Sequence, residues 1–106
     1  MHHSWTKEDV LVAFYLYKFQ NQGLGYPEDS ICKILGITKG SMKMAISNFA
    51  ALDGNPGLSN ASKAAQRVYS EYKDVTQDVI KHDVVKYINR KLNEFNSDKS
   101  QQLNYF

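Results

Sequence analysis

The chain has 106 residues, which is enough for one domain with one modest hydrophobic core. Its hydrophobic content of 42% and charged content of 23% are ordinary for a globular protein and argue against intrinsic disorder. A single cysteine, Cys32, excludes an internal disulfide and a cysteine-cluster metal site, and no apolar run approaches the length of a membrane span. Because the N-terminus MHHS lacks an apolar signal region, we expect a cytoplasmic protein in a reducing compartment.

The positive charge is concentrated in the middle of the chain. Residues 30–70 contain five basic side chains against Asp53 alone, a balance of +4, whereas the whole chain carries only +2. Residues 1–29 have a balance of −2, and the acids and bases of residues 71–106 cancel. Such an asymmetry favours a polyanionic partner.

The first predicted helix lies in the segment SWTKEDVLVAFYLYKFQ. Thr6 followed by Asp9 is typical of a capped helix start, and Val10, Phe14 and Tyr17 recur at helical spacing. Trp5, just ahead of the cap, is placed to pack onto the first turn as a core anchor. The segment NQGLGYP then predicts a loop.

The second and third predicted helices flank a glycine. Pro27, in a first-turn position, and two following acids predict a short helix that ends at Leu35, before Gly36. Thr38 is a plausible N-cap for a third helix that runs to about Leu52, where DGNPG ends it.

Two further helices and a tail complete the chain. Ser59 or Ser62 could cap a fourth helix, and Thr76 or Asp78 could start a fifth, TQDVIKHDVVKYINRKLNEF. Period-2 alternation typical of strands is missing. The sequence therefore predicts an all-α fold: a small helical bundle of about five helices that contains a helix-turn-helix. A single helical domain spans residues 1–96, and residues 97–106 form a flexible tail.

The helix-turn-helix prediction depends on burial around Gly36. Ile31 and Leu35 can bury together, and Cys32 is small enough for close helix approach. Gly36 can adopt the positive φ that ends the first helix, and Ile37 fills the corner. On the next helix we expect a buried stripe, made up of Met42, Ala45, Ile46 and Phe49.

The opposite face of that third helix is the candidate DNA-reading surface. It mixes lysines with short polar residues, namely Lys39, Gly40, Ser41, Lys43, Met44, Ser47 and Asn48. Asn48 could bond adenine in a bidentate manner, and Lys39 or Lys43 could reach guanine or phosphate. The predicted DNA-binding residues are Thr38, Lys39, Ser41, Lys43, Ser47, Asn48, Lys63 and Arg67, of which the last two would clamp phosphates. Plain solvation of an exposed helix remains the alternative for the lysines, and a cap on the DGNPG loop remains the alternative for Asn48.

The order of four segments adds a family resemblance. WTKEDVLVAFYLY, ICKILGITKGSMKMAISNFAALD, GLSNASK and RVYSEY follow one another in the chain. Together they resemble the N-terminal helix-turn-helix module found ahead of HNH-type endonuclease domains in bacterial restriction-like proteins. That resemblance covers roughly residues 4–73 and implies DNA engagement that delivers a nuclease. The matching positions are Trp5, Thr6, Glu8, Leu16, Tyr17, Leu35, Gly36, Thr38, Ser41, Asn48, Phe49, Asp53, Gly57, Leu58, Ser62, Lys63 and Tyr69.

The sequence departs from this family at three points. Met42 stands where valine is usual, residues 43–45 lack a frequent arginine, and we expect no nuclease in residues 74–106. A weaker resemblance is to Myb or SANT-type domains, which also open with a Trp-Thr-acid helix but carry further spaced tryptophans. Trp5 is the only tryptophan here.

Catalytic and metal-binding patterns are missing from the sequence. His2, His3 and His82 do not have zinc-ligand spacing, and Cys32 has no base nearby in sequence. No P-loop or dinucleotide-binding fingerprint occurs. We therefore expect a protein without enzymatic activity and without a cofactor.

Two functions of different class remain open. The first is a small non-catalytic DNA-binding protein of bacterial or phage origin, a transcriptional regulator or recognition module that binds double-stranded DNA. The second is a protein-interaction module, a phage or mobile-element inhibitor or adaptor, that uses the tyrosines and the last helix. That helix, with Ile80, Val84, Tyr87, Ile88 and Phe95 on one stripe, could close the core or pair two copies into a homodimer.

Overall fold

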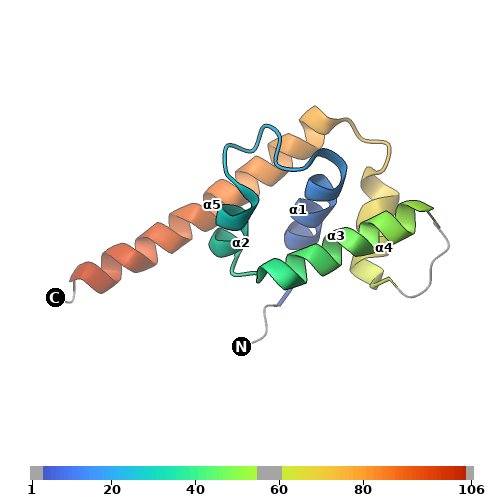
Figure 1. The fold of residues 1–106 in the computed structure, drawn as a ribbon. Helices are drawn as coiled ribbons and strands as arrows, with labels where there is room; N and C mark the ends of the chain where they lie inside the picture. The colour runs from blue at the N-terminus through green and yellow to red at the C-terminus, as the bar shows by residue number, and fades with distance from the viewer. Residues whose placement is uncertain (1–3, 55–60, 105–106) are drawn as a thin grey trace.

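The computed structural model describes residues 4–54 and 61–104, and all the regular structure in these ranges is helical (Figure 1). The predicted all-α bundle of five helices is confirmed. The helices are α1 (Lys7–Phe19), α2 (Glu28–Leu35), α3 (Lys39–Gly54), α4 (Lys63–Tyr72) and α5 (Gln77–Asn104).

The start of α1 has the predicted cap. The Asp9 N–H donates to Thr6 Oγ1 at 3.1 Å, and the Thr6 N–H donates to Asp9 Oδ2 at 3.0 Å. This reciprocal pair satisfies two amide groups that have no partner within the helix. The capping prediction for the first helix is therefore confirmed.

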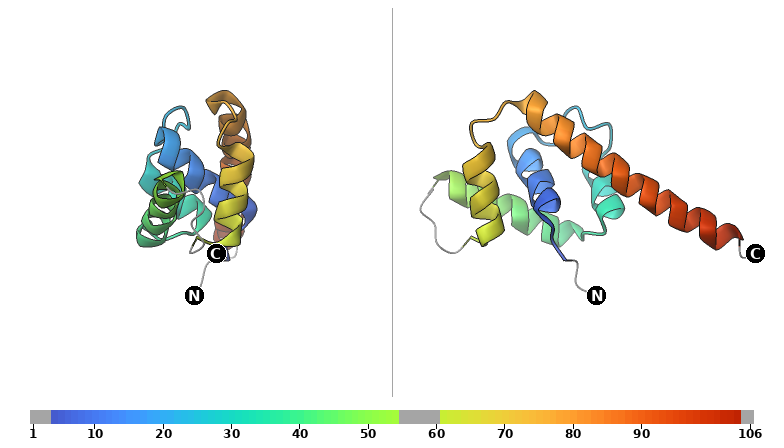
Figure 2. Two further views of the ribbon diagram at one scale, coloured as in Figure 1. Left: turned by 90° about the vertical axis from the view of Figure 1, so that its right-hand side faces the viewer. Right: turned by 180° about the vertical axis from the view of Figure 1, so that it is seen from behind.

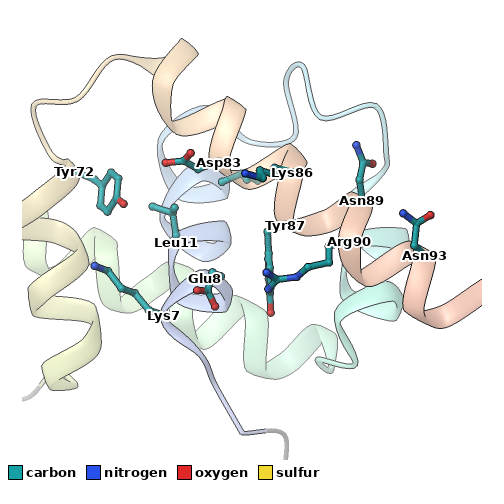
Figure 3. A pocket seen from close by; sticks show the side chains of 11 residues that line it. Lys7, Glu8, Leu11, Tyr72, Asp83, Lys86, Tyr87, Asn89, Arg90 and Asn93 are labelled. Atoms are coloured by element: carbon teal, nitrogen blue, oxygen red, sulfur yellow. The ribbon is translucent and has the colours of Figure 1, made fainter.

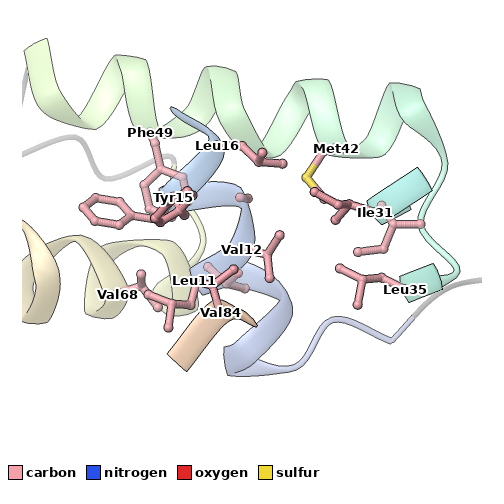
Figure 4. Packing of buried hydrophobic residues seen from close by; sticks show 14 of the residues in the cluster. Leu11, Val12, Tyr15, Leu16, Ile31, Leu35, Met42, Phe49, Val68 and Val84 are labelled. Carbon is pink, nitrogen blue, oxygen red and sulfur yellow. The ribbon is translucent and has the colours of Figure 1, made fainter. Parts of the chain in front are cut away.

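Helix α1 is the centre of the bundle. It packs against α3, α4 and α5 (Figures 1 and 2), and every residue from Asp9 to Leu16 is buried. The ring of Phe14 meets Phe49 of α3 edge-on, with 5.2 Å between centroids. Figure 4 shows side chains of several helices converging on α1. The helix is thus buried all round, which is wider than the stripe expected from its sequence.

The turn between α2 and α3 has the predicted geometry. Gly36 takes a left-handed conformation, with φ 74°, which glycine adopts without the Cβ strain of other residues. The Ile37 N–H donates to the Cys32 carbonyl at 2.9 Å, and the Ile37 side chain is buried. One detail of the prediction is wrong: Pro27 is the N-cap of α2, with ψ 156°, and α2 begins at Glu28.

The buried residues around this turn follow the prediction. Ile31, Cys32 and Leu35 of α2 are buried, as are Met42 and Phe49 of α3. The partly buried residues of the α3 stripe are Ala45 and Ile46. Helices α2 and α3 therefore form a helix-turn-helix whose inner faces belong to the main core.

The ends of α3 and α4 differ slightly from expectation. Helix α3 continues to Gly54, beyond the predicted end near Leu52. Ser62 caps α4 by accepting the Ala65 N–H at 3.1 Å. The other proposed cap, Ser59, and most of the DGNPG loop lie outside the described residues.

The first half of α5 closes the core. Ile80, Val84, Tyr87 and Ile88 are buried, and the helix packs against α1 and α2. Beyond this contact, α5 extends away from the other helices as a single rod (Figure 1). It passes the predicted domain end at residue 96 and reaches Asn104. The flexibility of residues 97–106 stays a prediction. None of the helices in the described ranges combines the length and the apolar character needed to span a membrane.

Candidate nucleic-acid interface

Helix α3 presents a broad exposed face beside the helix-turn-helix turn. Its fully buried side chains are Met42, Phe49 and Leu52, which lie on its inner side. All seven residues of the predicted outer face are exposed, namely Lys39, Gly40, Ser41, Lys43, Met44, Ser47 and Asn48. The outer face contains no acid, because Asp53, the one acid of the helix, is bonded to Tyr17 of α1 and Tyr69 of α4.

Two of the predicted DNA contacts form the N-terminal cap of α3. Thr38 Oγ1 accepts the Ser41 N–H at 3.1 Å and donates to Ser41 Oγ at 2.9 Å. The Thr38 hydroxyl therefore has a structural role in the free protein. Ser41 Oγ retains a donor hydrogen, because it serves as the acceptor in that pair.

The two lysines of the outer face differ in their surroundings. The Lys39 ammonium lies 2.9 Å from the carboxylate of Asp29 on α2, and both side chains are about two-thirds exposed, at 66% and 68%. The hydrogen bond to Asp29 raises the pKa of Lys39. Lys43 has no ion-pair partner among the described residues. Lys43 is therefore the less compensated cation on this face.

The predicted phosphate contacts Lys63 and Arg67 belong to α4 and not to the helix-turn-helix. Lys63 and Arg67 are both exposed, one helical turn apart. The Lys7 ammonium lies 2.9 Å from Glu71, and this bond raises the pKa of Lys7, while the charge of Arg67 opposes the shift. Arg67 is therefore near the start of α1, and the structure divides the predicted set between α3 and α4.

A shallow groove of about 410 Å³ lies between these two parts. Its polar residues are Ser41, Asn48 and Ser62, so two of the predicted α3 residues and the cap of α4 share one depression. The rest of the lining is apolar and comprises Trp5, Val10, Met44, Ala45, Phe49, Ala64 and Ala65. The sequence analysis missed this groove. Trp5, which the sequence predicts as a core anchor, does pack against the core as a partly buried residue, and it lines this groove as well.

A second depression, of about 710 Å³, lies between α1, α4 and α5 (Figure 3). The Arg90 guanidinium lies 5.1 Å from the centre of the Tyr87 ring, within the range of a cation–π contact. The lining contains Lys7, Lys86 and Arg90, but also the acids Glu8 and Asp83. This mixture of charges makes the depression a poorer polyanion site than the acid-free face of α3.

The carboxylate of Asp53 links the helices that carry the candidate interface. Tyr17 and Tyr69 donate to opposite oxygens of Asp53 at 2.6 and 2.9 Å, which ties the end of α3 to α1 and α4. These two hydrogen bonds hold the pKa of Asp53 below its ordinary value, and the bond to Asp53 raises the pKa of Tyr17 to about 12. The sequence analysis did not predict this cluster, because its three residues come from three helices.

Residues with catalytic or metal-binding potential are scattered. In the part of the chain that the structure describes, no three His, Cys, Asp or Glu side chains are grouped to hold a metal ion. Cys32 is buried, and burial raises the pKa of its thiol, which disfavours the reactive thiolate. Comparison of the chain with models of protein families, with curated proteins and with solved structures found no match.

Proposed function

We propose that the protein binds double-stranded DNA by placing α3 in the major groove. The observation that carries this proposal is the outer face of α3, which is exposed, free of acids and occupied by lysines and short polar side chains. An exposed helix after a short glycine turn is the element that helix-turn-helix proteins insert into the major groove.

The proposed contacts divide into two classes. Lys39, Lys43, Lys63 and Arg67 contact phosphates and supply most of the affinity through counterion release. Asn48 reads adenine, and Ser41 and Ser47 contact base edges or phosphates. Thr38 mainly orients the first turn of α3, because its hydroxyl caps that turn.

Regulation of transcription, or recruitment of another activity to DNA, is the proposed consequence. The first of these suits a cytoplasmic protein, and the second follows from the resemblance to modules that precede HNH-type nucleases. Neither requires the chain to carry out catalysis or to hold a cofactor.

A homodimer through α5 is proposed as the assembly that binds two half-sites. The observation that favours it is the length of α5, which continues to Asn104 and extends away from the other helices as a single rod (Figure 1). Sedimentation equilibrium tests it: a dimer has twice the 12.1 kDa mass of the chain, and a mass of 12.1 kDa at all concentrations refutes it.

The experiment for DNA binding compares the wild type with the double variant Lys43→Ala/Arg67→Ala. Loss of two phosphate contacts should weaken binding to duplex DNA and reduce the slope of log K against log salt by about 2. Lys81→Ala/Lys86→Ala on α5 is the charge-matched control and should bind as the wild type does. Equal binding by all three proteins would refute the proposed contacts of α3 and α4. Absence of binding by all three would favour a protein partner that docks on the apolar groove beside Met44.

A further inference from the structure

Met44 is an unusual side chain on the outer face of α3. It is 70% exposed and, with Val79 at 54%, is one of the two exposed large apolar side chains that the described residues contain. Single exposed apolar residues are common on protein surfaces and do not by themselves indicate a binding site. The position of Met44 is informative, because Lys43 precedes it and it borders the groove with Ser41 and Asn48.

The spacing of Met44 and Asn48 matches the spacing of base pairs. The two residues are four positions apart and line the same depression, so they project from one side of α3. Four residues rise about 6 Å along a helix, which is close to two base-pair steps of roughly 3.4 Å. Side chains at these two positions can therefore reach base pairs about two steps apart in one major groove.

The chemistry of the major groove supplies a partner for an apolar side chain there. The C5-methyl group of thymine is the apolar feature that distinguishes base pairs in the groove, and apolar side chains contact it. The unbranched, polarizable methionine side chain adapts its shape to such a surface. We infer that Met44 is a specificity-determining residue that contacts a thymine methyl group within about two base pairs of the adenine bound by Asn48. This inference rests on the proposed function and makes the preferred duplexes rich in A·T pairs.

Charge favours DNA over a protein as the occupant of this surface. The polar side chains around Met44 on α3 are lysines, serines and an asparagine, and the carboxylate that pairs with one of them, Asp29 with Lys39, belongs to α2. Duplex DNA combines a dense negative charge with methyl groups in the same groove, so it complements both the lysines and Met44.

The test uses thymine-to-uracil replacement, which removes the methyl group and leaves base pairing intact. Duplexes are first selected from a randomised library with the wild-type protein, and each thymine of the selected site is then replaced by uracil in turn. Fluorescence anisotropy measures the Kd of each duplex for the wild type, Met44→Ala and Met44→Leu. Val79→Ala, which shortens the other exposed apolar side chain, is the control variant.

The expected result is one thymine whose replacement weakens wild-type binding about fourfold, the ratio that corresponds to roughly 0.8 kcal/mol for one buried methyl group. Met44→Ala should show no such loss at that position, while Met44→Leu and Val79→Ala should retain it. The variants differ at exposed positions, so folding does not confound the comparison.

Other outcomes overturn the inference in distinguishable ways. If every replacement affects the wild type and Met44→Ala equally, or if no sequence is enriched, Met44 does not read thymine although DNA binding stands. If no duplex binds even at low salt, the proposed function fails as well. Met44 and the groove are then left as a docking surface for a protein.

Discussion

The phenol of Tyr87, in the middle of α5, donates a 2.6 Å hydrogen bond to the carboxylate of Asp9 in the first turn of α1. Asp9 is only 1% exposed, and its other oxygen accepts the Thr6 N–H. The Thr6 hydroxyl lies 3.3 Å from the Tyr87 oxygen. This network attaches α5 to the central helix, so α5 and the helix cap depend on each other.

We expect Tyr87→Phe to lower the free energy of unfolding by about 2 kcal/mol, because it removes a hydrogen bond to a buried carboxylate. Urea unfolding followed by circular dichroism measures the change. Tyr26→Phe is the matched control, since the carbonyl of Tyr26, and not its phenol, accepts the bond from Asn21. A Tyr87→Phe variant as stable as this control would show that the network contributes nothing.

The same network predicts a loss of stability at alkaline pH. Burial and, after it, the hydrogen bond to Asp9 raise the pKa of Tyr87 from 10.0 to about 12. A raised pKa in the folded state gives stability that is complete below pH 10.0 and is lost as the pH rises through about 12. Tyr17 titrates in the same window. Tyr87→Phe should therefore show a smaller decline of unfolding free energy across this window than the wild type.

The carboxylate of Asp53 predicts a loss of stability at acidic pH. Its hydrogen bonds from Tyr17 and Tyr69 lower its pKa below the ordinary 3.8, so the stability it provides is present above 3.8 and lost as the pH falls through the folded value. Asp53→Asn should lower the thermal midpoint near pH ~7, and the difference from the wild type should shrink near pH ~3. Asp74→Asn serves as the control. A difference independent of pH would mean that the carboxylate charge is irrelevant.

Removal of the acid from the Asp29–Lys39 ion pair should increase the affinity for DNA. Asp29→Asn leaves Lys39 uncompensated, so Kd for a duplex should fall by a factor of about two to five. Stability should hardly change, because the pair is exposed. Asp83→Asn removes the same charge from the depression between α1, α4 and α5 (Figure 3) and should have no effect on Kd. If both variants lower Kd equally, the change in net charge, and not the release of Lys39, explains the gain in affinity.

Alanine substitution of two glycines near the turn should change the free energy of unfolding in opposite directions. Gly36→Ala places a Cβ at φ 74° and should cost about 1 kcal/mol. Gly40 lies in the first turn of α3 with open space around its Cβ direction, so Gly40→Ala should stabilise by up to ~1 kcal/mol. Chemical denaturation of both variants measures the two changes. Destabilisation of similar size in both would contradict the assigned turn geometry.

The features that the sequence predicted correctly depend on neighbouring residues. The capping pair of Thr6 and Asp9, the left-handed Gly36 and the buried stripe of Met42 and Phe49 each follow from spacing within a few positions. Helical periodicity repeats every turn, so one short window holds the whole signal.

The features that were missed join residues far apart in the chain. Asp9 was expected to cap a helix, and it does, but its burial beneath Tyr87 requires the packing of α5 on α1. Lys39 was predicted as a guanine or phosphate contact, and its ion pair with Asp29 of α2 was not predicted. The groove beside Met44 exists because α3, α4 and Trp5 meet there, which no local pattern encodes.

Fluorescence anisotropy with a random-sequence duplex across a salt series tests the central claim most directly. If the four basic residues of α3 and α4 contact phosphates, the wild-type protein should bind at low salt with a slope of log K against log salt of about −3 to −4. Absence of binding at low salt, or binding that salt leaves unchanged, would contradict the assignment of α3 as a DNA-reading helix.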